Sequence, residues 1–159
     1  MLYDTAYRVG GKYGWDETIA QGACDGCLRD DVRYLLNHAG MPMARTVAGT
    51  LKLESDKRGL VSDATVDLRQ SLAADLTLAV DRGDIDQMSF AFRVKSQMWN
   101  DDYTERTIIE FEQLFDTSTV TYPANPATVV ALSRNLNDPD AEARRRQFFR
   151  HAAAIDLRF

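Results

Sequence analysis

The chain has 159 residues, 45% of them hydrophobic, and carries a formal net charge of -5 at neutral pH. This length supports one hydrophobic core rather than two ordinary domains, and no apolar run approaches the roughly 18 residues that a membrane span needs. The acidic balance argues against a surface that binds nucleic acid. We therefore expect a soluble, intracellular protein that binds neither nucleic acid nor membrane.

The first part of the chain predicts loops followed by strands. Residues 1–26 are rich in glycine and are expected to form mostly loop. The segment Asp31–His38 alternates in polarity and predicts a strand that His38 ends. Residues 50–53 and 60–66 predict two strands of a hairpin, because the polar segment between them, which closes on Gly59, has the composition of a hairpin loop.

A helix and a strand are predicted next. Leu68, Leu72, Leu76 and Val80 recur every four residues and predict an amphipathic helix over residues 67–82, which Gly83 caps. Residues 87–95 alternate strictly between apolar and small or polar side chains, as in a strand with one buried face. Ser89 falls on the face opposite Met88, Phe90, Phe92 and Val94.

Two further strands are predicted over residues 104–113 and 114–122, which are rich in Thr, Ile, Phe and Val. Asp138 and Pro139 then predict the start of a helix that runs to about Ile155. Six arginines and four acidic residues follow position 133, so this end is mildly basic while the body is acidic. We expect an α+β, mainly β domain over residues 1–137 and a separate C-terminal helix over residues 138–159.

Few residues qualify for nucleophilic catalysis, which requires a nucleophile, a base and a group that orients the base. The chain has only two histidines, His38 at the end of a predicted strand and His151 in the predicted C-terminal helix. Ser89 is one candidate nucleophile, on the polar face of its strand. Spacing alone does not assemble these residues into a site.

The sequence contains residues for two other kinds of site. Cys24, Cys27 and His38 are zinc-ligand types, but a fourth ligand at standard spacing is missing. Two small, partly buried residues of a short helix explain the cysteines better. Glu110, Glu112 and Asp116 are candidate acid-base carboxylates. Alternation places Glu110 and Glu112 on one face, which is more often simply solvated.

Six segments, in order, resemble the prohead maturation proteases of tailed phages. They are Trp15–Leu28, the strand ending in Asn37-His38, Ala44–Leu53 with its Gly-Thr-Leu, Asp56–Leu60, Arg82–Val94 with Met-Ser-Phe, and Leu114–Ala124 with Leu-Phe-Asp and Val-Thr-Tyr-Pro-Ala. The matches cover residues 15–124. The chain departs from the family pattern where Cys24 replaces Phe, where Ala91 replaces Gly and where Asp116 stands in place of the commoner Glu. In addition, Ala39-Gly40 replaces the acidic residue that usually follows Asn-His.

The resemblance implies a small antiparallel β-barrel surrounded by helices, similar to the herpesvirus maturation protease. It also implies a serine endopeptidase without cofactor or metal, in which Ser89 matches the nucleophile, His38 the general base and Asp116 the acidic third member. Glu112 is the substitute for that third role. No motif identifies the backbone N–H groups that would hold the oxyanion.

By the same resemblance the substrates are the scaffold protein and the N-terminal segment of the major capsid protein, cleaved inside the assembling prohead in the host cytoplasm, together with self-cleavage. The basic C-terminal helix is a candidate scaffold or capsid contact, and homo-oligomer formation stays open. Two alternatives are a non-catalytic capsid-assembly module that binds scaffold on the same fold, and an esterase or other hydrolase on the same scaffold.

Overall fold

The computed structural model describes residues 1–130 and residue 132. The expected C-terminal helix, and with it the domain boundary at residue 137, lies outside these residues. The described chain is mainly β, with one α-helix and two short 3-10 turns. In chain order its elements are β1 Tyr7–Val9, η1 Gly11–Tyr13, β2 Trp15–Ile19, η2 Asp25–Cys27, β3 Arg33–Leu36, β4 Ala39–Arg45, β5 Leu51–Ser55, β6 Leu60–Ala64, α1 Ser71–Arg82, β7 Gln87–Trp99 and β8 Glu105–Val120.

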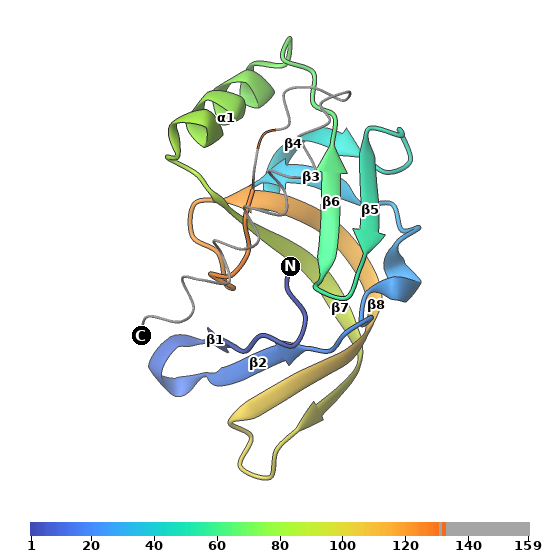
Figure 1. Ribbon diagram of the computed structural model, residues 1–159, viewed down its shortest axis with the longest axis vertical. Coiled ribbons are helices and arrows are strands. Elements are labelled where there is room, and N and C mark those ends of the chain that lie inside the picture. The colour runs from blue at the N-terminus through green and yellow to red at the C-terminus, as the bar shows by residue number, and fades with distance from the viewer. Residues whose placement is uncertain (131, 133–159) are drawn as a thin grey trace.

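Strand β8 is the longest strand and connects the rest of the large sheet (Figure 1). One edge of β8 pairs with the antiparallel strand β7 along most of its length. The other edge pairs in parallel with β2 near its start and with β3 near its end. Between these two, η2 and its flanking residues lie against the middle of β8, where the Ala23 carbonyl accepts a hydrogen bond from Phe111 N at 2.8 Å.

The fold differs from the sequence-based expectations at three places. The glycine-rich start contains strands β1 and β2, which form a hairpin because Gly10 and Gly11 supply the left-handed backbone of its turn. The two strands expected over residues 104–122 are the single strand β8, since the Leu114 backbone N–H is satisfied by the Asp30 carboxylate at 2.8 Å and pairing continues past it. Strand β4 was not expected at all.

The expectation of a small antiparallel β-barrel surrounded by helices was also wrong. The strands form an open six-stranded sheet and a separate two-stranded sheet, and the large sheet is mixed because β2 and β3 run parallel to β8. Within the described residues a single α-helix accompanies the sheets, not a surrounding shell. The α+β, mainly β class is consistent with this architecture.

Other expectations were confirmed. Residues 51–55 and 60–64 form the β5–β6 hairpin. The helix begins later than expected, at Ser71, and ends at Arg82, followed by Gly83 in the left-handed conformation of a C-cap. Leu76 is buried on it, whereas Leu68 precedes the helix and is exposed. None of the helices in the described part of the chain is long and apolar enough to span a membrane.

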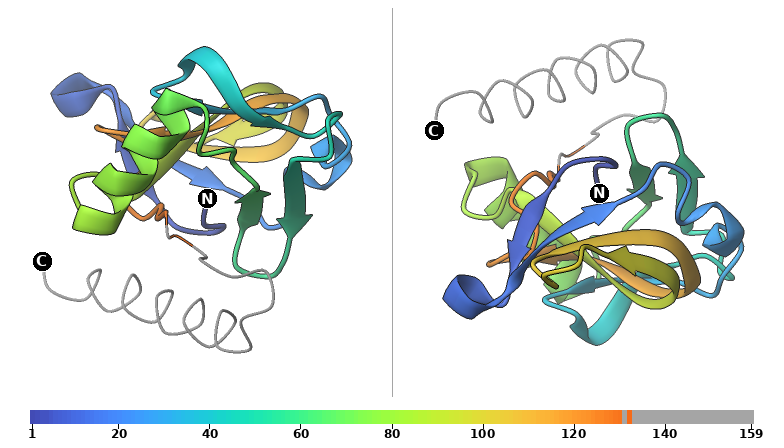
Figure 2. Two further views of the ribbon diagram at one scale, coloured as in Figure 1. Left: turned by 90° about the horizontal axis from the view of Figure 1, so that it is seen from above. Right: turned by 90° about the horizontal axis from the view of Figure 1, so that it is seen from below.

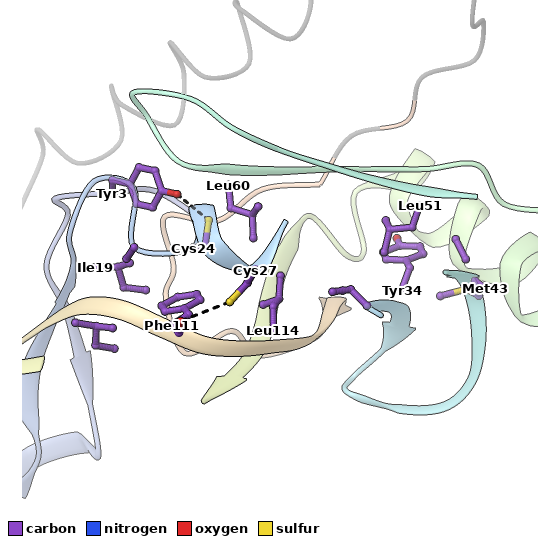
Figure 3. Close-up of a cluster of buried hydrophobic side chains, with 14 of the residues drawn as sticks. Tyr3, Ile19, Cys24, Cys27, Tyr34, Met43, Leu51, Leu60, Phe111 and Leu114 are labelled. Carbon is purple, nitrogen blue, oxygen red and sulfur yellow. Dashed lines mark hydrogen bonds between the residues drawn. The ribbon is translucent and has the colours of Figure 1, made fainter. Parts of the chain in front are cut away.

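The hydrophobic core lies between the large sheet and the β5–β6 hairpin, which stands beside that sheet rather than continuing it (Figure 2). Leu60 of the hairpin lies on the same side of β8 as Cys24 and Cys27, and Leu114 of β8 lies below them (Figure 3). Phe90, Phe92 and Phe111 stack from β7 and β8. This packing fixes which face of β7 and β8 is buried and leaves the other face for a site.

The core predicts a clear contrast between two adjacent isoleucines of β8. Ile108 is 0% exposed and Ile109 is 39% exposed. We expect Ile108→Ala to lower the free energy of unfolding by about 2–5 kcal/mol, because it removes buried methyl groups and leaves a cavity. Ile109→Ala, the matched control, should cost less than about 1 kcal/mol. Urea unfolding measures both, and equal losses would contradict the described facing of β8.

Candidate active site

Asp116 faces away from the core because strand β8 contains a bulge. Ala91 pairs with Asp116 and Phe92 pairs with Leu114, which leaves Phe115 as an extra residue on β8. Without it, Leu114 and Asp116 would lie on the same face of the strand. With it, Leu114 is fully buried in the core and Asp116 lies on the opposite face. The bulge thus allows a core leucine two residues before a polar site.

His38 lies in the tight turn between β3 and β4. Leu36 pairs with Ala39, so Asn37 and His38 are the two turn residues, with φ angles of 51° and 59°. Two positive φ angles are the signature of a type I′ hairpin turn. Asn37 fastens this turn to the end of β8: its backbone N–H donates to the Thr119 carbonyl, and Thr121 N donates to Asn37 Oδ1, both at 2.9 Å.

The structure brings His38 and Asp116 into direct contact. His38 Nδ1 lies 2.7 Å from Asp116 Oδ1, and the two residues are 78 positions apart in the sequence. The Asp116 side chain is 10% exposed and that of His38 is 37% exposed. A carboxylate at Nδ1 fixes the tautomer with its proton on that nitrogen and leaves Nε2 as the basic atom. Nε2 makes no hydrogen bond within the described residues.

Ser89 lies on the same face as Asp116. It pairs across the ladder with Ser118, two residues beyond Asp116 on β8. Directly opposed residues of an antiparallel pair have Cβ atoms about 5 Å apart. Ser89 is half-buried, and its hydroxyl has no hydrogen-bond partner in the described part of the chain. No hydrogen bond joins Ser89 to His38 there, and catalytic hydrogen bonds are often long before substrate binds.

The other carboxylate candidates lie apart from this contact. Glu112 is exposed and makes a 3.7 Å ion pair with Arg93 on the outer surface of the β7–β8 pair. Glu110 makes a 2.7 Å ion pair with Lys95. Neither ion pair includes His38. The geometry therefore favours Asp116 over Glu112 as the partner of the histidine.

Cys24 and Cys27 are both buried and unbridged. Tyr3 Oη lies 2.8 Å from Cys24 Sγ, and Cys27 Sγ donates to the Phe111 carbonyl at 3.6 Å. Burial raises the pKa of both thiols, that of Cys27 to about 11. Within the residues that the structure describes, no group of three or more His, Cys, Asp or Glu side chains could hold a metal ion. Both cysteines belong to the hydrophobic core cluster.

Sequence reasoning missed Ser118 and Asn37, whose contacts support this site. Ser118 is fully buried, and its Oγ donates to Asp116 Oδ1 at 2.7 Å. The signal for it was the alternation of β8, which places residues 116 and 118 on one face. Asn37 could have been found from the preference of Asn for backbone with positive φ in hairpin turns.

A histidine whose Nδ1 contacts a carboxylate is the base and orienting group that serine hydrolases use, and Ser89 lies on the same face of the sheet as that carboxylate. The family profile described as caudovirus prohead serine protease matches residues 1–141, and the chain belongs to that family. No curated protein and no solved structure matches this chain significantly. The family confirms the resemblance seen in the sequence and indicates a serine protease.

The turn that carries His38 predicts a stability series at Asn37. Asn37→Ala loses both side-chain hydrogen bonds to Thr121. Unlike asparagine, alanine has no polar side chain that can stabilise a positive φ locally, so we expect the free energy of unfolding to fall by about 2 kcal/mol. Asn37→Gly keeps the backbone freedom and should lose about 1 kcal/mol. Urea unfolding measures the series, and equal losses would argue against a strained turn.

Burial of the cysteines predicts slow thiol chemistry. At pH 8 an unfolded cysteine, with a pKa of about 8.5, is partly thiolate. Because the pKa of both buried thiols is raised, we expect iodoacetamide to leave the native chain unmodified and to alkylate both cysteines in urea. Intact-mass spectrometry counts the additions. Rapid alkylation of the native chain would contradict the described packing of Cys24 and Cys27.

Proposed function

We propose that this protein is a maturation protease that cleaves the scaffold protein and the N-terminal segment of the major capsid protein inside the assembling prohead in the host cytoplasm, and that it also cleaves itself. The observation that carries the proposal is the 2.7 Å contact between His38 Nδ1 and Asp116 Oδ1, which leaves Nε2 as the free base. Membership of the prohead serine protease family supports it independently.

The proposed chemistry is acyl transfer to Ser89. His38 Nε2 takes the proton of the Ser89 hydroxyl as its oxygen attacks the peptide carbonyl carbon. Asp116 stabilises the imidazolium that forms. Collapse of the tetrahedral intermediate breaks the C–N bond, and the Nε2 proton passes to the leaving amine. The same base then activates a water molecule, which releases the acyl group and restores Ser89.

The partly exposed position of Ser89 makes it a better candidate for the nucleophile than Ser118. Ser118 is 0% exposed and its hydroxyl is already engaged with Asp116. A peptide carbonyl would have to enter the sheet to reach it. Ser89 is half-buried and its hydroxyl is unengaged among the described residues, as a nucleophile that meets a substrate requires.

The first experiment is co-expression of this chain with the major capsid protein of its own virus, with intact-mass spectrometry of the products. We expect discrete capsid fragments with wild type and a fall in cleavage rate of about 10³-fold or more with Ser89→Ala. Ser96→Ala, a substitution of the same kind on the same strand β7, should cleave as wild type does.

The outcomes separate the alternatives. Fragments that persist in Ser89→Ala would place the nucleophile elsewhere. Intact capsid protein with all three chains, with normal assembly, would favour a capsid-assembly module that binds its partners without cleaving them. Turnover of small esters without peptide cleavage would instead favour an esterase on the same scaffold.

A further inference from the structure

Asp116 Oδ1 is contacted by two groups at equal distance. His38 Nδ1 and Ser118 Oγ both lie 2.7 Å from this one oxygen. Ser118 is 0% exposed and Asp116 is 7% exposed, so the contact from Ser118 is shielded from water. A hydrogen bond to a charged acceptor in such a place is stronger than a neutral one, and few other donors are available to replace it.

The backbone of Ser118 is held from both sides. Ser118 lies in the interior of the sheet, paired on one side with Leu35 of β3 and on the other with Ser89 of β7. Its backbone is therefore held by strands on both edges. A short side chain with one χ1 angle on a backbone so constrained has little freedom, and it orients the carboxylate that it contacts.

The cationic residue that pairs with Asp116 is engaged elsewhere. Arg33 pairs with Asp116 across the β3–β8 ladder. Its guanidinium, however, donates to the carbonyl and carboxylate oxygens of Asp31 at 2.8 and 3.0 Å. The hydrogen-bond donors to the Asp116 carboxylate within the described residues are thus His38 and Ser118. Of these two, only Ser118 is immobilised by strands on both sides.

We propose that Ser118 is a positioning residue of this active site: it holds the Asp116 carboxylate in the orientation that fixes the Nδ1–H tautomer of His38. This role rests on the proposed function of the His38–Asp116 pair. It requires no contact between Ser118 and the substrate. Ser89 is the group that meets the substrate, and Ser118 acts through Asp116 and His38.

The test compares Ser118→Ala with a matched control, Thr119→Val. Thr119 is the adjacent residue of β8 and is also 0% exposed, but its hydroxyl lies 2.5 Å from Tyr34 Oη on the opposite face. Both variants delete a buried hydroxyl contact from neighbouring positions. Only Ser118→Ala should alter the environment of His38, whereas loss of stability alone should follow from Thr119→Val.

The first readout needs no substrate. NMR of the imidazole nitrogens and of the Nδ1 proton reports the His38 tautomer, and His38→Gln identifies its signals. We expect Ser118→Ala to give a mixed tautomer and at least about tenfold faster exchange of the Nδ1 proton, since tenfold corresponds to about 1.4 kcal/mol. Thr119→Val should match wild type. An unchanged His38 spectrum in Ser118→Ala would overturn the proposal.

The second readout is cleavage. Ser118→Ala should lower kcat about tenfold with little change in KM, because the substrate is bound by other residues. Ser118→Thr, which keeps the hydroxyl, should recover most of the rate. Ser118→Cys keeps the volume and donates only weakly, so it replaces the alanine variant if that chain unfolds. If wild type cleaves nothing, the proposed function fails while the NMR measurement still decides the role of Ser118.

Discussion

The site depends on one extra residue in β8. Side chains along a strand alternate between its two faces, so a buried leucine at position 114 would normally place residue 116 in the core as well. The bulge at Phe115 reverses the alternation, and the Asp30 carboxylate satisfies the Leu114 N–H beside it. One strand can therefore close the hydrophobic core over its first part and present Asp116 and Ser118 on the other face over its last part. Without this bulge the carboxylate would be buried among phenylalanines, where its charge would be costly.

The remaining parts of the site come from neighbours of the same strand. Strand β3 lies parallel to the end of β8 and ends in the turn that carries His38, while β7 lies antiparallel to β8 on its other edge and carries Ser89. The contact between His38 and Asp116 spans 78 residues of sequence, so it forms only when the sheet is assembled. Pairings of this separation are slow to form, because the conformational entropy of closing the loop is lost before the contacts that stabilise it are made. Assembly of the sheet and assembly of the site are therefore a single event.

The sequence predicted what local periodicity controls. The strict alternation at Met88–Val94 gave both the strand and the outward face of Ser89, and the leucine spacing with Gly83 gave the helix. It could not predict the strand pairing, because the residues of β2 and β8 show no local pattern that identifies each other as parallel partners. The bulge could not be predicted either, because the sequence Leu-Phe-Asp is compatible both with one continuous strand and with two separate strands. The roles proposed for Ser89, His38 and Asp116 come from resemblance to a family, and the structure adds that the last two are in contact.

The turn at Asn37 and His38 has an evolutionary consequence. Glycine is the residue that a type I′ turn favours at its second position, and His38 occupies that position with a φ of 59°. Selection for stability alone would replace this histidine with glycine. A chain under such selection would gain folding free energy in the same step that removes the proposed base. At this one position, the side chain that contacts Asp116 and the backbone preference of the turn therefore favour different residues.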